Sequence, residues 1–312
     1  DQAMTSIFSS FPVFPYVAII NQVDKSRNLP CLNKSLINNG YHSSYFFGGQ
    51  LTYGNIKGYL LSQGFDIVKD EEDYKYLPAG RLGVHDEYMF SQFRDELDRL
   101  PQPFMSSLFT LSSHSPFDFP AEHSLSFNSQ EDDYVNSVAY TDSCLGEFFR
   151  SVKDAAWYDN TLFIVVADHS HNSPRNWRLA QKERFKIPML WFGQVLKQAY
   201  KGRKWDKLSS HIDISPTILK QLGQSYSTYK FGVDIFNIEQ QVFVPYAFPK
   251  GYGLITNQGY YAFSEAYNTM LEEESIIDSN QVGRIKEQME MYFQAAFEEY
   301  LVYIELCALL LL

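Results

Sequence analysis

Short apolar runs alternate with helical patterns over the first 240 residues, and this alternation constrains the fold more than any other feature of the chain. Strands are expected within residues 44–48, 103–112, 162–167 and 187–192. One helix is expected to end near Asn39-Gly40, and others are expected over residues 134–156 and 214–222. Strands that alternate with helices imply crossover connections and a mainly parallel sheet. The pattern therefore predicts an α/β fold with a doubly wound, mainly parallel sheet flanked by helices.

The pattern changes from Gln241 onward. Three strand-like segments follow one another at residues 242–248, 251–259 and 260–266, and Asn257-Gln258-Gly259 is a turn signal. A helix is expected at roughly residues 282–301. We therefore predict two domains: a core over residues 1–240, and a small C-terminal antiparallel subdomain with a closing helix over residues 241–312.

Composition excludes some classes of protein. The 312 residues include 22 Tyr and 25 Phe, which is enough apolar material for a sizeable core. The net charge of -11 and the lack of a basic patch argue against nucleic-acid binding. The charged run Lys69–Asp73 is interpreted as a solvated loop. The three cysteines, Cys31, Cys144 and Cys307, lack paired spacing, so we expect small buried residues and no zinc cluster or disulfide framework.

The chain has no apolar run of about 18 residues that could span a membrane, and no signal peptide. It begins with "DQAMTS" and ends with "CALLLL", so we expect it to be a soluble fragment of a longer protein. Missing targeting segments therefore do not indicate a cytoplasmic location.

Chemistry-bearing residues follow two of the predicted strands. Ser113-His114 comes after residues 104–112, and Asp168-His169-Ser170-His171 comes after residues 162–167. Ligands of open parallel sheets bind beyond the carboxyl ends of the strands. Because the chain has only seven histidines, the placement of three of them after strands is informative. We predict that His114, Asp168, His169 and His171 share one site.

The adjacent pair Asp168-His169 has two interpretations on residues alone. A carboxylate oxygen and a neutral imidazole suit Zn²⁺, Mn²⁺ or a similar divalent ion. Alternatively, Asp168 caps a following helix and His169 forms only local hydrogen bonds. The spacing leaves both interpretations open.

Five segments, in this order, resemble a known family. "TLSSHSPF", "YVNSVAYTDSCLGEFF", "WYDNTLFIVVADHSH", "KIPMLWFG" and "HIDISPTILKQLG" are similar to segments of the sulfatase-like branch of the alkaline phosphatase superfamily. Within that branch the chain resembles the lipoteichoic acid synthase family of membrane-anchored phosphoglycerol transferases. The resemblance covers residues 1 to about 240 and is less specific beyond them.

The resemblance implies a fold, a cofactor and roles for particular residues. The family fold is a doubly wound sheet with a small antiparallel sheet appended. Family members use a threonine nucleophile and one divalent metal ion, usually Mn²⁺ or Mg²⁺, with Zn²⁺ as an alternative. Asp168 and His169 are then metal ligands. His114 and His171 are then catalytic residues that contact the substrate phosphate, and His85, in "GRLGVHDEYMF", borders the substrate site.

The sequence departs from the family pattern in three places. Ser170 stands where relatives usually have Gly, and Ser adopts positive φ at a higher cost. Leu82 stands where this subgroup commonly has Trp. The family nucleophile aligns just before Asp1, so the nucleophile, an early acidic metal ligand and the anchoring helices are expected upstream of this chain. Thr5 is the only nearby substitute, but its segment aligns better with the helix that follows the nucleophile.

These features predict metal-dependent transfer of phosphoglycerol, or a related phosphoryl group, from a lipid-linked phosphodiester to a cell-envelope acceptor through a phosphoryl-threonine. The full-length protein is expected on the extracytoplasmic face of a bacterial cytoplasmic membrane, which it would reach through its missing N-terminal region. A sulfatase is an alternative, although none of the cysteines lies in the C-x-P-x-R context that a formylglycine enzyme needs. A phosphoethanolamine transferase and a truncated, non-catalytic domain are the remaining alternatives.

Overall fold

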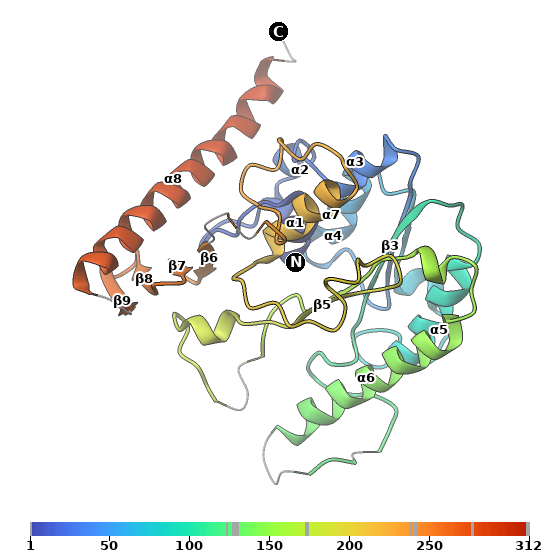
Figure 1. Cartoon of the computed structure of the whole chain (residues 1–312). Helices are drawn as coiled ribbons and strands as arrows, with labels where there is room; N and C mark the ends of the chain where they lie inside the picture. Colours follow the sequence, from blue (N-terminus) through green and yellow to red (C-terminus); the bar gives the residue numbers. More distant parts are fainter. Residues whose placement is uncertain are drawn as a thin grey trace. The chain divides into compact units, whose positions relative to one another are not determined.

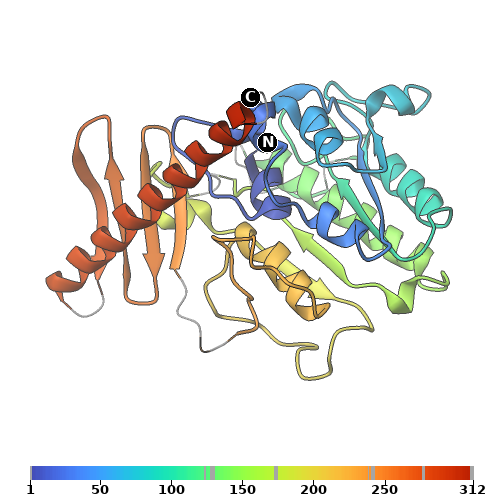
Figure 2. The same ribbon diagram turned by 90° about the horizontal axis from the view of Figure 1, so that it is seen from above.

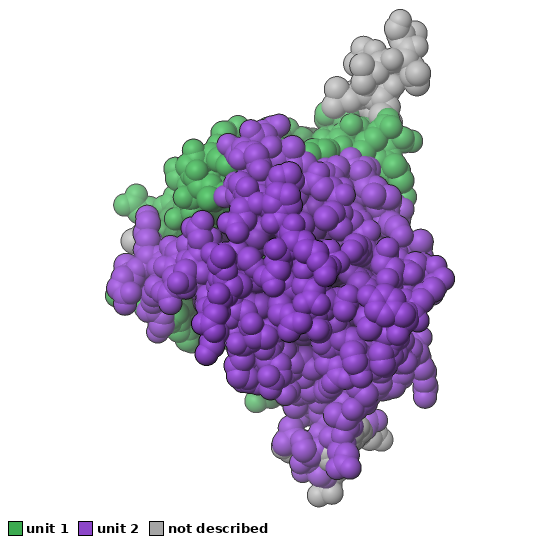
Figure 3. Space-filling model, turned by 90° about the vertical axis from the view of Figure 1, so that its right-hand side faces the viewer, with its two compact units in different colours: residues 1–35, 166–189, 203–312 green, residues 36–165, 190–202 purple. Residues whose placement is uncertain are grey.

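The computed structural model describes residues 2–122, 124–126, 131–171, 175–237, 239, 243–275 and 278–309. The chain divides into two compact units, each built from segments that are discontinuous in sequence (Figure 3). Unit 1 comprises residues 1–35, 166–189 and 203–312. Unit 2 comprises residues 36–165 and 190–202.

Unit 2 contains a parallel sheet of three strands in the order β2-β1-β3. The strands are β1 (His42–Phe47), β2 (Ile67–Lys69) and β3 (Phe104–Phe109). Ser44 of β1 pairs with Ile67 on one side and with Ser106 on the other. Two further strands, β4 (Phe163–Val166) and β5 (Met189–Phe192), form a sheet of their own at the sequence boundaries between the units. The mixed α/β class with a parallel sheet is therefore confirmed.

The helices of unit 2 bury apolar side chains that recur at helical spacing. They are α4 (Ile56–Ser62), α5 (Asp86–Leu97) and α6 (Asp132–Val152), and α3 (Leu32–Ile37) reaches into this unit from unit 1. On α6, Tyr140, Cys144, Phe148 and Val152 recur every fourth residue, so they share one face of the helix, and all four are buried. This face packs against apolar residues of α5 and β3 in one cluster.

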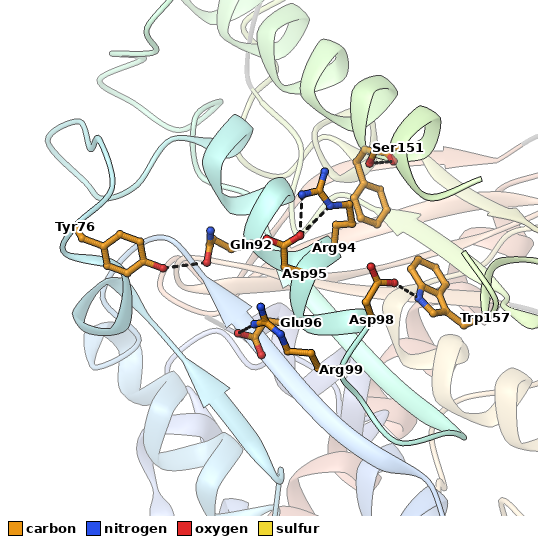
Figure 4. Close-up of polar contacts among 10 residues, drawn as sticks. Tyr76, Gln92, Arg94, Asp95, Glu96, Asp98, Arg99, Ser151 and Trp157 are labelled. Atoms are coloured by element: carbon orange, nitrogen blue, oxygen red, sulfur yellow. Dashed lines mark hydrogen bonds and ion pairs between the residues drawn. The ribbon is translucent and has the colours of Figure 1, made fainter. Parts of the chain in front are cut away.

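The polar side of α5 is fixed by side-chain contacts to its neighbours (Figure 4). Trp157 donates from Nε1 to Asp98 Oδ1 over 2.8 Å, just beyond the end of the helix. Tyr76 donates from its hydroxyl to Gln92 Oε1 over 3.0 Å. Lys69 Nζ lies 2.6 Å from Glu96 Oε1. These contacts hold the helix whose first residue is Asp86.

The charged run Lys69–Asp73 is not the solvated loop that we expected. Lys69 ends β2, and Asp70 is 2% exposed. The Asp70 carboxylate accepts a hydrogen bond from Lys57 Nζ over 2.8 Å and caps the 3-10 helix η3 (Glu71–Tyr74). A buried carboxylate needs a compensating partner, and Lys57, which lies 13 residues away, could not be identified from the run itself.

Unit 1 contains the predicted antiparallel sheet, with strand order β6-β7-β8-β9. Its strands are β6 (Phe243–Phe248), β7 (Gly251–Thr256), β8 (Gly259–Ser264) and β9 (Thr269–Ser275). Residues 241 and 242, at the start of the predicted C-terminal domain, lie outside the described residues. The long helix α8 (Ser279–Leu309) runs along this sheet (Figure 2).

In the core of unit 1, residues near the start of the chain pack against the C-terminal helix α8. Phe11 and Phe14 pack in one cluster with Tyr292, Phe293 and Tyr300 of α8. The remaining helices of the unit are α1 (Gln2–Ser9), α2 (Val23–Ser26) and α7 (Ile214–Gln221), all labelled in Figure 1. The other 3-10 turns of the chain are η1 (Ile19–Asn21), η2 (Tyr53–Asn55), η4 (Tyr158–Asn160), η5 (Lys182–Phe185) and η6 (His211–Asp213).

Cys31 and Cys144 are buried, as expected. The side chain of Cys307 lies outside the described part of the chain. Among the helices that the structure describes, none combines the length and the apolar character needed to cross a bilayer.

Candidate active site

The Asp168-His169 pair lies in a bend directly after β4, with only Ala167 between the strand and the bend. The Asp168 side chain is 28% exposed and that of His169 is 70% exposed. Asp168 Oδ1 accepts a hydrogen bond from the His169 backbone N–H over 2.9 Å. That bond occupies Oδ1 and turns the other oxygen, Oδ2, toward the imidazole, whose Nε2 lies 3.6 Å away.

The hydrogen bond of the His169 ring fixes its tautomer. Nδ1 lies 2.9 Å from the Ser170 carbonyl oxygen. Because a carbonyl oxygen can only accept, Nδ1 carries the proton, and in the neutral ring Nε2 presents its lone pair. Metal-ligating histidines are usually oriented in this way, with the second ring nitrogen donating to a carbonyl or carboxylate. The bend therefore presents a lone pair of Nε2 on the same side as Asp168 Oδ2.

This donor set fits a divalent ion. With metal–ligand bonds of about 2.1 Å, two ligand atoms of a tetrahedral site are roughly 3.4 Å apart, close to the 3.6 Å between Asp168 Oδ2 and His169 Nε2. Within the described ranges, no group of three or more His, Cys, Asp or Glu side chains is assembled as a metal site. The pair therefore accounts for two ligands of such an ion, and their role as ligands stays a prediction.

Ser170 replaces the family glycine without the backbone cost that we expected. The non-glycine residues recorded with positive φ in the described part of the chain do not include Ser170. Its hydroxyl donates instead to the carbonyl oxygen of Arg184, just before η5 ends. The serine therefore ties the bend to the segment that follows it. His171, the next residue, is exposed, and residues 172–174 lie outside the described residues.

His211 contacts Ala167, just before this bend, although no role was expected for it from the sequence. It begins η6 and donates from Nε2 to the Ala167 carbonyl oxygen over 2.7 Å. Burial lowers the pKa of His211, against the opposing effects of the Ala167 hydrogen bond and the nearby Asp168 carboxylate. The signal that could have identified it is its place at the head of "HIDISPT", one of the segments that carried the resemblance.

In unit 2, His114 lies in an exposed turn after β3. Its Nδ1 is 2.6 Å from the Ser115 carbonyl oxygen, which again makes Nδ1 the protonated nitrogen and Nε2 the acceptor. The backbone of the turn closes on itself through a 2.9 Å hydrogen bond from Phe117 N–H to the His114 carbonyl oxygen. The imidazole is therefore held at an exposed strand end with a nitrogen available for proton transfer.

The loop that carries His114 is organised by Asp86, which is 1% exposed. Asp86 Oδ1 accepts hydrogen bonds from the backbone N–H groups of Leu111 and Ser112 over 2.8 and 3.2 Å. The Asp86 N–H donates in return to Ser112 Oγ over 2.9 Å. This reciprocal pair fastens the first residue of α5 to the end of β3.

His85 is the N-cap residue of α5 and is 9% exposed. A Cβ atom placed on Gly80 would come within 2.8 Å of both the His85 ring and the Asp118 carboxylate. Gly80 therefore allows its backbone to pass close to these two side chains. A substrate-binding role for His85 stays a prediction. Asp168, His169 and His171 belong to unit 1 whereas His85 and His114 belong to unit 2, so the single shared pocket also stays a prediction.

The comparisons with known proteins assign a family. A family model described as Sulfatase matches residues 2–224. The chain belongs to the sulfatase family. Lipoteichoic acid synthase 2 of Bacillus subtilis is 26% identical to it over 313 residues, which cover 91% of this chain. The aligned part is 46% of that protein, so the chain spans less than half the length of this curated relative.

Solved structures agree with this assignment. An alkaline phosphatase superfamily protein from Vibrio parahaemolyticus aligns with a TM-score of 0.79 and 25% identity, over 96% of this chain and 76% of that chain. The lipoteichoic acid synthase LtaP from Listeria monocytogenes aligns with a TM-score of 0.77 and 22% identity, over 96% and 79% respectively. The C-terminal periplasmic domain of EcEptC from Escherichia coli, solved as a complex with Zn, shares the fold with a TM-score of 0.53 at 17% identity, over 78% of each chain. The resemblance and the fold class are therefore confirmed.

Proposed function

We propose that the protein carrying this chain is a metal-dependent transferase that moves phosphoglycerol, or a related phosphoryl group, from a lipid donor to a cell-envelope acceptor. The observation that carries the proposal is the bend after β4, where Asp168 Oδ2 and His169 Nε2 lie 3.6 Å apart and the second imidazole nitrogen is engaged by a carbonyl. The 26% identity to a lipoteichoic acid synthase supports phosphoglycerol as the group transferred.

Asp168 and His169 would hold one divalent ion, Mn²⁺ or Mg²⁺, with Zn²⁺ as the alternative. Such an ion supplies positive charge to a phosphodiester and lowers the pKa of a hydroxyl nucleophile. The Nδ1–H of His169 stays on the Ser170 carbonyl, which keeps the ring in one orientation throughout the reaction.

The nucleophile would be a threonine upstream of Asp1. Its hydroxyl would lose its proton to solvent as its oxygen attacks phosphorus, and the bond from phosphorus to the lipid oxygen would break. An acceptor hydroxyl or water would then attack the phosphoryl-threonine at phosphorus, and the threonine oxygen would leave. Thr5 is poorly suited to this role. It is 2% exposed, and its Oγ1 donates to the Gln2 carbonyl oxygen over 2.9 Å within α1.

His114 and His171 would contact the non-bridging phosphate oxygens, and one of them would protonate the leaving lipid oxygen. Both residues are exposed, which leaves them accessible to a substrate. His85 would border the substrate. Its buried position at the start of α5 favours a role in shaping the site.

The partner would be a lipid-linked phosphodiester, reached through membrane association of an N-terminal region outside this chain. The protein would then work on the extracytoplasmic face of a bacterial cytoplasmic membrane. The net charge of -11 makes a nucleic-acid partner unfavourable.

The test is turnover of phosphatidylglycerol by the full-length protein in detergent with Mn²⁺, followed by the appearance of diacylglycerol. We expect turnover that is lost in Asp168→Ala and retained in His42→Ala, a control at an exposed histidine that opens β1. Turnover that is the same with and without chelator would contradict the proposal.

Two other substrates test the alternatives. The family model that matches is described as Sulfatase, so an aryl sulfate must be assayed beside the lipid. Cys31 and Cys144 are both buried and lack the C-x-P-x-R context, which disfavours a formylglycine nucleophile in this chain. Phosphatidylethanolamine tests the phosphoethanolamine transferase. A full-length protein that is folded but inactive on all three substrates would support the non-catalytic alternative.

A further inference from the structure

The segment Ser210–Thr217, which we call the bridging segment, hydrogen-bonds to several other parts of unit 1. It consists of η6 with its cap residue, followed by the first half of α7. One of its contacts reaches Ala167, just before the bend that holds Asp168, and another reaches the carboxyl end of α1. Because all three parts belong to unit 1, these contacts are internal to one compact body.

The first contact fixes the peptide just before Asp168. His211 donates from Nε2 to the Ala167 carbonyl oxygen over 2.7 Å. The N–H of Ala167 donates to the Pro188 carbonyl oxygen over 3.4 Å. Ala167 is therefore held at both its N–H and its C=O. The bond from His211 orients the Ala167 carbonyl, and with it the peptide that leads into Asp168.

The second contact fixes the end of α1. Ser215 is fully buried, and its hydroxyl lies 2.5 Å from the Ile7 carbonyl oxygen and 3.2 Å from that of Phe8. The last carbonyl groups of a helix have no partner within the helix, and this hydroxyl supplies a hydrogen-bond donor to them at the end of α1. Ser10, just past the helix, returns a 2.5 Å hydrogen bond from its hydroxyl to the Ile212 carbonyl oxygen.

The bridging segment is itself braced. The Asp213 carboxylate accepts hydrogen bonds from the N–H groups of Ser210 and Val233 over 2.8 and 2.9 Å. Thr217 donates from Oγ1 to the Asp213 carbonyl oxygen over 2.6 Å and accepts from the Ile235 N–H over 2.9 Å. Two of these bonds lie within the segment, and the other two tie it to Val233 and Ile235, so its backbone is fixed between its contacts with Ala167 and with α1.

We infer that the bridging segment fixes the position of the Asp168-His169 pair relative to α1, and that His211 and Ser215 are positioning residues for the metal site. The inference rests on the proposed function, in which α1 follows the nucleophile and the pair binds the ion. Neither residue is assigned a contact with the ion. Their effect is to keep Asp168 Oδ2 and His169 Nε2 at a fixed place relative to the helix.

The test measures Mn²⁺ affinity of the full-length protein by calorimetry. We expect His211→Ala to weaken the affinity by about 10- to 100-fold, the usual effect of removing a group that orients a metal ligand. His211→Gln keeps an N–H donor and should restore most of the loss. Ser215→Ala should weaken the affinity less than His211→Ala, because it acts through α1 alone.

Two controls separate positioning from general destabilisation. Ser35→Ala removes a 2.8 Å hydroxyl contact to Tyr229 elsewhere in unit 1, and His42→Ala removes an exposed imidazole from unit 2. Both should leave the Mn²⁺ affinity unchanged. Hydrogen exchange of residues 167–171 in the metal-free protein should accelerate in His211→Ala and stay unchanged in the controls.

The outcomes distinguish the two proposals. If the wild type binds Mn²⁺ through Asp168 but His211→Ala binds it equally well, with only a lower unfolding temperature, the positioning inference is overturned and the proposed function stands. If the wild type binds no divalent ion, or Asp168→Ala binds it as well as the wild type, the proposed function fails and the inference fails with it.

Discussion

Thr141, in the middle of α6, donates a 2.7 Å hydrogen bond from Oγ1 to Oδ2 of Asp86, the first residue of α5. The other oxygen of the same carboxylate accepts from the N–H groups of Leu111 and Ser112 at the end of β3. One buried carboxylate therefore joins two helices to the loop that carries His114.

Replacing Asp86 with Ala should destabilise the protein by about 2–4 kcal/mol, because two backbone N–H groups lose a charged acceptor. The turn that carries His114 should also lose its anchor, so the KM for the lipid should rise. Urea unfolding measures the first effect and steady-state kinetics the second. Asp142→Ala, at an exposed acid on α6, should stay within about 0.5 kcal/mol of the wild type. Equal stabilities for the two variants would refute the anchoring role.

Asp168→Ala should abolish activity of the full-length protein and His169→Ala nearly so, with the fold largely intact in both. Losing one ligand of a four-ligand site removes affinity together with the charge that activates the nucleophile. His114→Ala should retain bound metal and lose turnover, because its proposed contact is the substrate phosphate. Metal content measured beside turnover separates these roles. Loss of metal in His114→Ala as complete as in Asp168→Ala would move His114 into the ligand set.

Residues 1–312 alone should be catalytically silent, even with Mn²⁺ added. The physical reason is that the nucleophile is proposed to lie outside this chain, and that Thr5, the first threonine of the chain, is buried and bonded within α1. The measurement is hydrolysis of a phosphodiester by the purified fragment beside the full-length protein. Hydrolysis by the fragment that disappears in Thr5→Ala would assign the nucleophile to Thr5 after all.

His114, Asp168, His169 and His171 should occupy one pocket once the two units are seen in a fixed arrangement. The residues follow β3 and β4, and ligands of such sheets bind at the carboxyl ends of the strands. A crystal structure of the full-length protein with bound Mn²⁺ is the appropriate measurement. A separation of more than about 10 Å between the side chains of His114 and Asp168 exceeds a direct or water-bridged contact and would exclude a shared site.

Burial raises the pKa of Asp213 from its usual 3.8 to about 6, against the opposing effect of the N–H groups of Val233 and Ser210. Between these two values the folded protein keeps a proton that the unfolded chain has lost, so this group's contribution to stability falls as the pH rises through that window. The loss amounts to roughly 3 kcal/mol at most.

The measurement compares the free energy of unfolding of the wild type and Asp213→Asn at intervals between pH 4 and pH 7. The amide cannot ionise, so the variant should gain stability relative to the wild type as the pH rises. The opposite trend would mean that the two N–H donors outweigh burial and that the carboxylate is ionised in the fold at lower pH.

Several elements could be predicted from the sequence because their patterns are local. The helical spacing of apolar residues predicted a helix over residues 134–156, and α6 spans Asp132–Val152. The strand ending before Asp168 was predicted over residues 162–167, and β4 spans Phe163–Val166. The short strand β2 was missed, since its three residues, Ile67–Lys69, run directly into acidic residues and give no alternation.

The parts of the site that could not be predicted depend on long-range pairing. His211 meets Ala167 across 44 positions, and Asp86 meets Ser112 across 26. Nothing in the residues around Asp86 shows that its carboxylate is buried under α6. The sequence could therefore predict which strand ends carry the chemistry but not which side chains hold those ends in place.

The contact between Phe11, Phe14 and α8 also has a consequence for the order of folding. These aromatic residues find their core partners at Tyr292, Phe293 and Tyr300, and Lys25 donates to the Tyr300 carbonyl oxygen over 3.1 Å. Most of unit 2, by contrast, comes from the continuous stretch 36–165. During synthesis unit 2 gains most of its contacts early, whereas Phe11 and Phe14 stay without their partners on α8 until that helix has been made. A premature stop in the last helix would therefore expose the apolar residues at the opposite end of the chain.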